Sequence, residues 1–200
     1  MKVMISALCL SWKFTIVKGL YAITPNQILN VLLIQQMLER HQPYALQYRH
    51  KTDDAQLKLS EANELKQLCA SHNTVFMIND DINLAQKVQA DGVHLGKNDG
   101  SIHNARACLG AQSIIGVSCY NDLNLALRAQ DQGADYVAFG ALFKSKTKPE
   151  AAYCAPEVLR AAKAQLEIPI VGIGGIDFDN QAQAFAQGCD AVAMINALYE

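Results

Sequence analysis

The chain has 200 residues, of which 50% are hydrophobic and 18% are charged, and its formal net charge is -2. This length suffices for one domain with a full core, or for a small α/β barrel. The near-neutral charge argues against nucleic acid or an anionic membrane surface as a partner. The six cysteines are scattered without a Cys-x-x-Cys pair, so we expect reduced thiols in a cytoplasmic protein.

The N-terminal segment differs from the rest of the chain. Residues from Val3 to Trp12 are almost all apolar and are flanked by Lys2 and Lys13, as in a weak signal-peptide core. The segment is too short to span a bilayer as a helix, and no small-x-small cleavage site precedes the first strand. We therefore expect residues 1–18 to form an extension of unknown role and residues 19–200 to form one domain.

Short apolar runs with strand character recur along this domain, roughly 20–30 residues apart, which leaves room for a helix and two loops between them. Each run is followed by a polar segment. The eight expected strands are Leu20–Ile23, Ala45–Tyr48, Val75–Ile78, Gly92–Leu95, Ile114–Val117, Tyr136–Phe139, Ile170–Ile173 and Ala191–Ile195.

The segments between the runs have the caps and periodicity of helices. Asp53 or Asp54 can cap a helix whose stripe contains Leu57, Glu61 and Leu65. The other expected boundaries are Asp81 as a cap, Asn121 as the cap of a helix over Leu123–Gln132 that ends at Gly133, Pro156 in the first turn of a helix to Gln165, and Asp179 before Gly188.

Eight strand–helix units without a linker indicate the α/β class and a single-domain (β/α)8 TIM barrel. The alternative is an open doubly wound sheet, whose Gly-x-Gly-x-x-Gly motif should follow the first strand. The glycine cluster Gly172–Gly175 follows the seventh strand instead, where barrels commonly bind phosphate. Few residues remain after Asn196, which leaves open an imperfectly closed barrel or one that relies on a partner chain.

Polar side chains gather at the end of the second expected strand. Because side chains alternate along a strand, Gln47, Arg49 and Lys51 share a face if the strand continues. Two cations and an amide suit a polyanion joined to a hydrogen-bonding ring, and arginine offers phosphate a bidentate fork. An ordinary solvated strand end would have the same composition.

Acidic residues follow the next two strands. Asp80 comes after Asn79, and Asp99 lies just past the fourth strand. Two carboxylates from neighbouring strands could share a Mg²⁺ ion, which prefers oxygen ligands. Asp81 is expected to be only a helix cap. His94, inside the fourth strand, is interpreted as a buried or supporting residue and not as a ligand.

Further donors follow later strands. Ser145, Thr147 and Lys148 can donate to phosphate or to a ring substituent, although a basic surface loop would look alike. Ser118 ends the fifth strand. Backbone N–H groups near Gly175, and those of a short helix that begins at Ile195-Asn196, could hold a phosphate. These two anion subsites suit an enzyme that joins a pyrophosphate ester to a second phosphorylated molecule.

Several motifs occur in a fixed order from Gly19 to the C-terminus, and together they resemble the thiamine-phosphate synthase family. The first 18 residues lie outside the resemblance. The motifs are Gly19–Pro25, Gln-x-Arg-x-Lys at 47–51, Ile78-Asn79-Asp80, Ala90–Gly96 with Asp99, Gly116-Val117-Ser118, Gly133–Val137 and Gly172–Gly175.

The resemblance implies a barrel enzyme that joins 4-amino-5-hydroxymethyl-2-methylpyrimidine diphosphate to a thiazole phosphate, with Mg²⁺ as cofactor and these two small molecules as its partners. It implies that Arg49, Lys51, Ser118 and Lys148 are catalytic. The pyrimidine diphosphate would contact these four with Gln47 and Asn79, Mg²⁺ would bind Asp80 and Asp99, and the thiazole phosphate would contact Ser145, Thr147, Gly175, Ile195 and Asn196.

Two positions depart from the family pattern, since Ser145 replaces a threonine and Asn196 replaces a serine. Three alternatives stay open: a thiazole tautomerase paralogue, a non-catalytic thiamine-phosphate-binding protein, and an unrelated barrel isomerase with His94 or His50 as its base. The sequence also leaves open a homo-oligomer.

Overall fold

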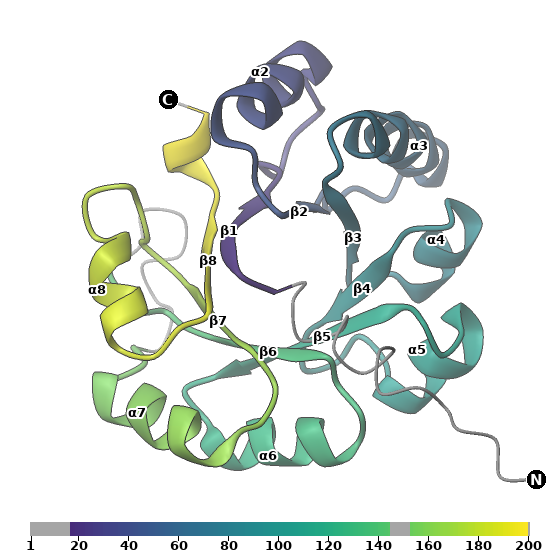
Figure 1. The fold of residues 1–200 in the computed structure, drawn as a ribbon. Helices are drawn as coiled ribbons and strands as arrows, with labels where there is room; N and C mark the ends of the chain where they lie inside the picture. The colour runs from purple at the N-terminus through teal and green to yellow at the C-terminus, as the bar shows by residue number, and fades with distance from the viewer. Residues whose placement is uncertain (1–16, 145–152, 200) are drawn as a thin grey trace, which may run out of the picture.

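The computed structural model describes residues 17–144 and 153–199, and these form a closed barrel of eight parallel strands surrounded by helices (Figure 1). The strands are β1 (Gly19–Ile23), β2 (Ala45–Tyr48), β3 (Val75–Asn79), β4 (Gly92–Leu95), β5 (Ile114–Tyr120), β6 (Tyr136–Phe139), β7 (Ile170–Ile173) and β8 (Ala191–Met194). The helices are α2 (Val31–His41), α3 (Ala55–Ser71), α4 (Ile82–Lys87), α5 (Ile102–Leu109), α6 (Leu123–Asp131), α7 (Pro156–Gln165), α8 (Gln181–Ala186) and the 3₁₀ turn η1 (Asn196–Leu198).

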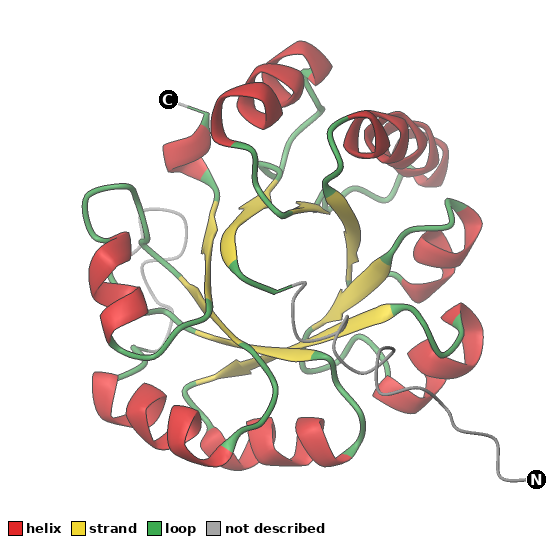
Figure 2. Ribbon diagram, in the orientation of Figure 1, coloured by secondary structure: helices red, strands yellow, loops and turns green. Residues whose placement is uncertain are grey.

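The ring of strands is complete, with every helix outside it (Figure 2). β8 pairs with β1 in parallel, from Gly19 opposite Ala191 to Ala22 opposite Met194. The prediction of a TIM barrel is therefore confirmed, and the prediction of imperfect closure is wrong. Closure depends on the hydrogen bonds between β8 and β1, so it does not require a full last helix after β8.

Strand alternation divides the core into two layers. One layer fills the barrel interior and includes Tyr21, Met77, Tyr136 and Val171. The other layer packs the opposite faces of the strands against the helices, as Phe76 does. Since every second residue of a strand points inward, the same alternation that fills the barrel places Gln47, Asn79, His94 and Ser118 on the inner side.

Aspartates at the amino ends of three strands tie the barrel to its helices. The Asp135 carboxylate accepts from the Ile115 backbone N–H at 2.8 Å and pairs with Arg106 at 2.7 Å. Asp91 and Asp190 repeat this arrangement. Asp91 accepts from Phe76 N and pairs with Lys66, and Asp190 accepts from Ile170 N and pairs with Lys163. The Ala-Asp steps at 90–91 and 134–135 therefore stabilise the fold, at the end of the barrel opposite the carboxyl ends of the strands.

The helix caps agree in part with the sequence. Asp54 and Asp81 cap α3 and α4 as predicted. The cap of α6 is Asp122 and not Asn121, since the Asp122 carboxylate accepts from the Leu125 N–H at 3.0 Å. The Asn121 amide donates to Tyr153 O instead, at 3.3 Å.

Asp179 does not begin α8. The cap position is Asn180, whose side chain binds the preceding turn at Asp177 N and Gly175 O.

The cysteines and the lengths of the helices bear on two further expectations, those of reduced thiols and of no membrane-spanning helix. The five cysteines among the described residues are all free thiols, in line with the absence of a disulfide framework. Within residues 17–144 and 153–199, every helix is too short or too polar to cross a membrane.

Candidate active site

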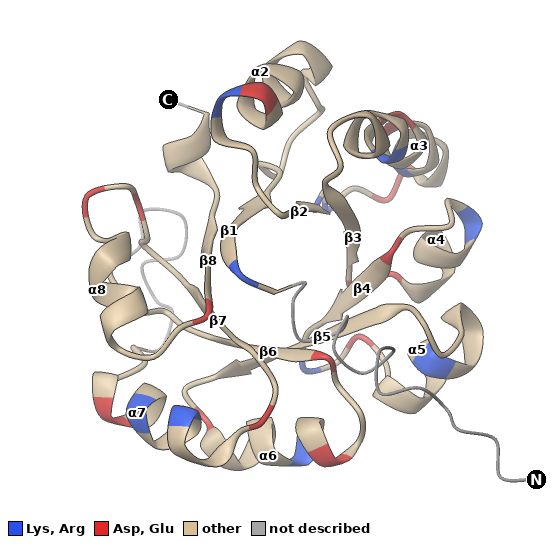
Figure 3. Ribbon diagram, in the orientation of Figure 1, with Lys and Arg blue, Asp and Glu red and all other residues tan. Residues whose placement is uncertain are grey.

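Charged residues are absent from all eight strands and lie on the helices, in the loops and at strand ends, as the coloured ribbon of Figure 3 shows. The charges that concern the site come directly after the carboxyl ends of β2, β3 and β4. They are Arg49 and Lys51, then Asp80, then Asp99. Because parallel strands all end at the same edge of the barrel, these cations and carboxylates converge there.

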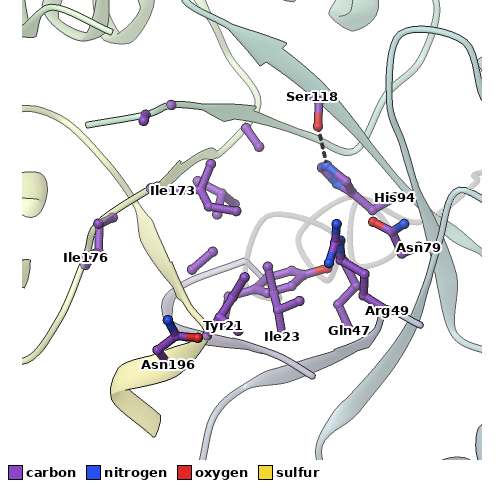
Figure 4. Close-up of a pocket in the computed structure, with 18 of the residues that line it drawn as sticks. Tyr21, Ile23, Gln47, Arg49, Asn79, His94, Ser118, Ile173, Ile176 and Asn196 are labelled. Atoms are coloured by element: carbon purple, nitrogen blue, oxygen red, sulfur yellow. Dashed lines mark hydrogen bonds between the residues drawn. The ribbon is translucent and has the colours of Figure 1, made fainter. Parts of the chain in front are cut away.

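One cavity, of about 560 Å³, opens at this edge and is called the main cavity because inward side chains of the strands line it. In Figure 4 the side chains of Gln47, Arg49, Asn79, His94 and Ser118 lie on one side of the cavity, and Asn196 lies on the other side. The predicted site residues that line the cavity are Gln47, Arg49, Asn79, Ser118, Gly175, Ile195 and Asn196.

A chain of hydrogen bonds crosses the barrel beneath this cavity. Gln47 Nε2 donates to Tyr21 Oη at 2.9 Å, and the Tyr21 and Tyr136 hydroxyls are 2.9 Å apart. Tyr136 Oη lies 2.9 Å from His94 Nδ1, and His94 Nε2 lies 2.8 Å from Ser118 Oγ. The chain therefore links the inner faces of β2, β1, β6, β4 and β5.

Burial keeps the members of this chain neutral. It raises the pKa of Tyr21 to about 12 and raises the pKa of Tyr136 well above its ordinary value. Burial also lowers the pKa of His94 to about 4, against a smaller opposing effect of Asp99. Gly116 leaves room for the Tyr136 ring, since a Cβ at position 116 would overlap the ring atoms. The expectation that His94 is buried is confirmed, and its supporting role stays a prediction.

A second cavity, of about 590 Å³, adjoins the first at Asn79 and holds the acidic pair. Lys51 Nζ lies 3.6 Å from Asp80 Oδ2. Burial raises the pKa of Asp99, and the negative charge of Asp80 and a hydrogen bond between the two carboxyl groups raise it further. The hydrogen bond from the Gly96 N–H and the positive charge of Lys51 lower this pKa. The two carboxylates therefore repel each other in the protein by itself.

This acidic pair fits a hard cation. Asp80 adopts a left-handed conformation, with φ of 65°, and its N–H donates to His94 O at 2.8 Å. Asp99 Oδ2 accepts from Gly96 N at 3.0 Å, and a Cβ on Gly96 would overlap that oxygen. In the described part of the chain no three His, Cys, Asp or Glu side chains cluster as a metal site. Two carboxylates do suit Mg²⁺, which takes its other oxygens from water and substrate phosphates.

The buried carboxylate of Glu61, on α3, supports the segment that contains Arg49 and Lys51. It accepts from Tyr48 Oη at 2.6 Å, His50 Nδ1 at 2.8 Å and the Leu29 N–H at 2.9 Å. Burial by itself would raise the pKa of Glu61, but these hydrogen bonds and the charge of His50 lower it. Glu61 therefore joins the end of β2 to the loop before α2.

The opposite end of the main cavity is built by a tight loop after β7. Gly174 and Gly175 have φ of 95° and 65°, which favour glycine. A Cβ on Gly175 would lie 2.6 Å from Lys144 O. Asn180 Nδ2 donates to Gly175 O at 2.8 Å and fixes the loop. Ile195 and Asn196, after β8, complete this end of the cavity.

Some site residues escaped sequence reasoning. Tyr21, Tyr120 and Tyr136 also line the main cavity. Strand alternation carries a signal for Tyr21 and Tyr136, which share the inward parity of Ile23 and Ala138. Three predicted residues, Ser145, Thr147 and Lys148, lie outside the described residues, so their roles stay predictions.

A closed (β/α)8 barrel with cations, carboxylates and a glycine loop at its carboxyl end is typical of enzymes that bind phosphate-bearing ligands. The fold and the site thus define a barrel of this class. Comparison with known proteins narrows the class to one family.

The chain matches the thiamine monophosphate synthase model over residues 20–198. A thiamine-phosphate synthase from Methylococcus capsulatus is 46% identical over 91% of this chain and 82% of its own length. A thiamine-phosphate synthase from Chromobacterium violaceum is 46% identical over 92% of this chain and 89% of its own length. The solved structure of a thiamine phosphate pyrophosphorylase from Pyrococcus furiosus superposes with a TM-score of 0.83 and 31% identity, covering 94% of this chain and 90% of that one. The chain belongs to the thiamine monophosphate synthase family.

Proposed function

We propose that this protein is a thiamine-phosphate synthase. It would join 4-amino-5-hydroxymethyl-2-methylpyrimidine diphosphate to a thiazole phosphate and release pyrophosphate. The observation that carries the proposal is the pair of cavities that adjoin at Asn79, one with cations and carboxylates and the other with a glycine loop. The named relatives support it.

The diphosphate would lie at the end of β2. Arg49 lines the main cavity and Lys51 the second one, so the two cations lie on either side of their junction. Gln47 and Ser118 would contact the pyrimidine ring deeper in the barrel. The thiazole phosphate would lie at the other end, with its phosphate near Gly175 and Asn196. Ser145, Thr147 and Lys148 stay proposed contacts.

The reaction we propose is dissociative. The methylene C–O bond breaks, and its electron pair leaves with pyrophosphate while the ring amino group donates electrons toward the methylene carbon. The lone pair of the thiazole nitrogen then forms the new C–N bond. Arg49 and Lys51, with Lys148, would neutralise the departing charge, and the cavity would hold the two rings in line. This scheme needs no protein nucleophile.

Asp80 and Asp99 would hold Mg²⁺. When bound, the ion would neutralise charge on the departing pyrophosphate. Burial and repulsion from Asp80 raise the pKa of Asp99, and a bound cation would relieve that repulsion. Lys51, which is 56% exposed, lies close enough to Asp80 to share in holding the same phosphates.

The test is a coupling assay on the purified protein. Both substrates are mixed with and without Mg²⁺, and thiamine phosphate is detected by oxidation to its fluorescent thiochrome. We expect Mg²⁺-dependent product that requires both substrates. No product from folded protein would contradict the proposal and favour the tautomerase or a binding role.

A further inference from the structure

The hydrogen-bond chain beneath the main cavity has a direction. Gln47 Nε2 can only donate, so Tyr21 Oη is an acceptor at its first link. Tyr21 has a single hydroxyl hydrogen. Among the described residues, the other hydrogen-bond partner of Tyr21 Oη is the Tyr136 hydroxyl, so the hydrogen of Tyr21 goes there.

The same reasoning continues across the barrel. Tyr136 Oη accepts from Tyr21, and its own hydrogen has His94 Nδ1 as its remaining partner in the described part of the chain. Nδ1 is then an acceptor, so the neutral imidazole carries its proton on Nε2 and donates to Ser118 Oγ. A doubly protonated ring would leave the Tyr136 hydrogen without an acceptor.

Ser118 stands at the end of this chain and at the surface of the cavity. Its Oγ accepts from His94, so its own hydrogen is available for a ligand in the cavity that Ser118 lines. Figure 4 shows Ser118 and His94 joined at the edge of the cavity, with Asn79, Arg49 and Gln47 on the same side. A ligand group that meets this hydrogen must be an acceptor, such as the lone pair of a ring nitrogen.

We propose that this chain fixes His94 as the Nε2–H tautomer and thereby makes Ser118 a hydrogen-bond donor to a ring nitrogen of the pyrimidine substrate. Tyr21, Tyr136 and His94 are then positioning residues for Ser118. The identity of the ring depends on the proposed function, whereas the tautomer of His94 does not.

The direction is measured first, on the free protein. Long-range ¹H–¹⁵N NMR spectra of protein labelled with ¹⁵N-histidine distinguish the protonated ring nitrogen from the bare one. The chain has 5 histidines, and the signal that disappears in His94→Gln belongs to His94. We expect a single tautomer with the proton on Nε2. A proton on Nδ1 would mean that the Gln47 amide oxygen faces Tyr21 and that Ser118 donates to His94, which overturns the proposal, as does a doubly protonated or mixed state.

The consequence for the substrate is measured with Tyr136→Phe, which removes the central hydroxyl and keeps the ring. We expect His94 to lose its single tautomer. The KM for the pyrimidine diphosphate should rise about five-fold, the effect of one net hydrogen bond, with kcat changed by less than about two-fold. An unchanged tautomer and an unchanged KM would overturn the proposal.

Tyr44→Phe is the matched control, because Tyr44 packs edge-on against Tyr21 at 5.7 Å but contributes no atom to the chain. It should leave the tautomer and both KM values unchanged. Tyr21→Phe breaks the chain one step earlier and should act in the same direction as Tyr136→Phe, so a folding failure of one variant does not decide the matter. If the parent shows no turnover, the proposed function fails, and the NMR measurement still decides the direction of the chain.

Discussion

Glu61→Ala should lower the free energy of unfolding by about 3–5 kcal/mol. Glu61 is 6% exposed, and its carboxylate accepts three hydrogen bonds. Bonds to a charged group contribute about 1.5–3 kcal/mol each. The buried Tyr48 hydroxyl would lose its full bond, whereas the partly buried Leu29 N–H and His50 ring would regain some water.

Chemical denaturation checks this value, with Glu64→Ala as the control. Glu64 lies on the same helix and is exposed, so its loss should change stability by less than about 0.5 kcal/mol. Glu61→Ala should also lower kcat/KM for the pyrimidine diphosphate about ten-fold, because it releases the segment that carries Arg49 and Lys51. Equal stability of the two variants would refute the reasoning.

The pH dependence of Glu61 has a definite sign. Its pKa is lowered in the folded protein, so its stabilisation is complete above the ordinary value of 4.5 and is lost as the pH falls through the folded value. The stability difference between the parent and Glu61→Gln should be constant down to about pH 5 and shrink below it. A difference that grew on acidification would contradict the assignment.

Three other substitutions separate activity from stability. Asp99→Asn should lower kcat/KM about 100-fold, yet it should raise the melting temperature of the metal-free protein, because the repulsion between Asp99 and Asp80 ends. Melting curves with and without Mg²⁺ check this, and a metal-free variant that melts below the parent would contradict it. Gly116→Ala would push a Cβ into the Tyr136 ring, so denaturation should show a loss of about 1–3 kcal/mol, and an unchanged midpoint would be at odds with this packing. Asp135→Asn should cost about 1–3 kcal/mol with turnover unchanged, since it lies at the amino end of the barrel; lost turnover at full stability would place it in the site.

Much of the barrel could be predicted because its signals are local. The bounds of the eight predicted strands agree with the observed bounds to within three residues at either end, and Asp54 and Asp81 cap helices as expected. The wrongly predicted helix caps lie where two neighbouring residues are both of a type that can cap a helix. Asn121 and Asp122 both suit a cap, and it is the Asp122 carboxylate that accepts from the Leu125 N–H, while Asn121 donates to Tyr153, far along the chain.

The predicted site residues within the described part of the chain all line the two cavities. They follow strand ends, and a parallel barrel brings all strand ends to one edge. What the sequence could not show is which inward side chains contact one another. Tyr21, His94 and Tyr136 come from strands that are not neighbours, so their hydrogen bonds exist only after the barrel closes.

Glu61 illustrates the same limit on a helix. Its place near the apolar stripe of α3 is visible in the sequence, but its partners at Leu29, Tyr48 and His50 come from other elements. A glutamate on the buried face of a helix therefore indicates that its carboxylate has a buried partner, but the sequence does not identify that partner.

The central claim is that the two ends of the joined cavities bind different substrates. Titration calorimetry of each substrate against Arg49→Ala and Gly175→Ala tests it most directly. We predict that Arg49→Ala weakens the pyrimidine diphosphate about 100-fold and the thiazole phosphate by less than about three-fold. Gly175→Ala, whose Cβ would meet Lys144 O, should do the reverse. A reversed pattern, or equal losses for both substrates in both variants, would contradict the account.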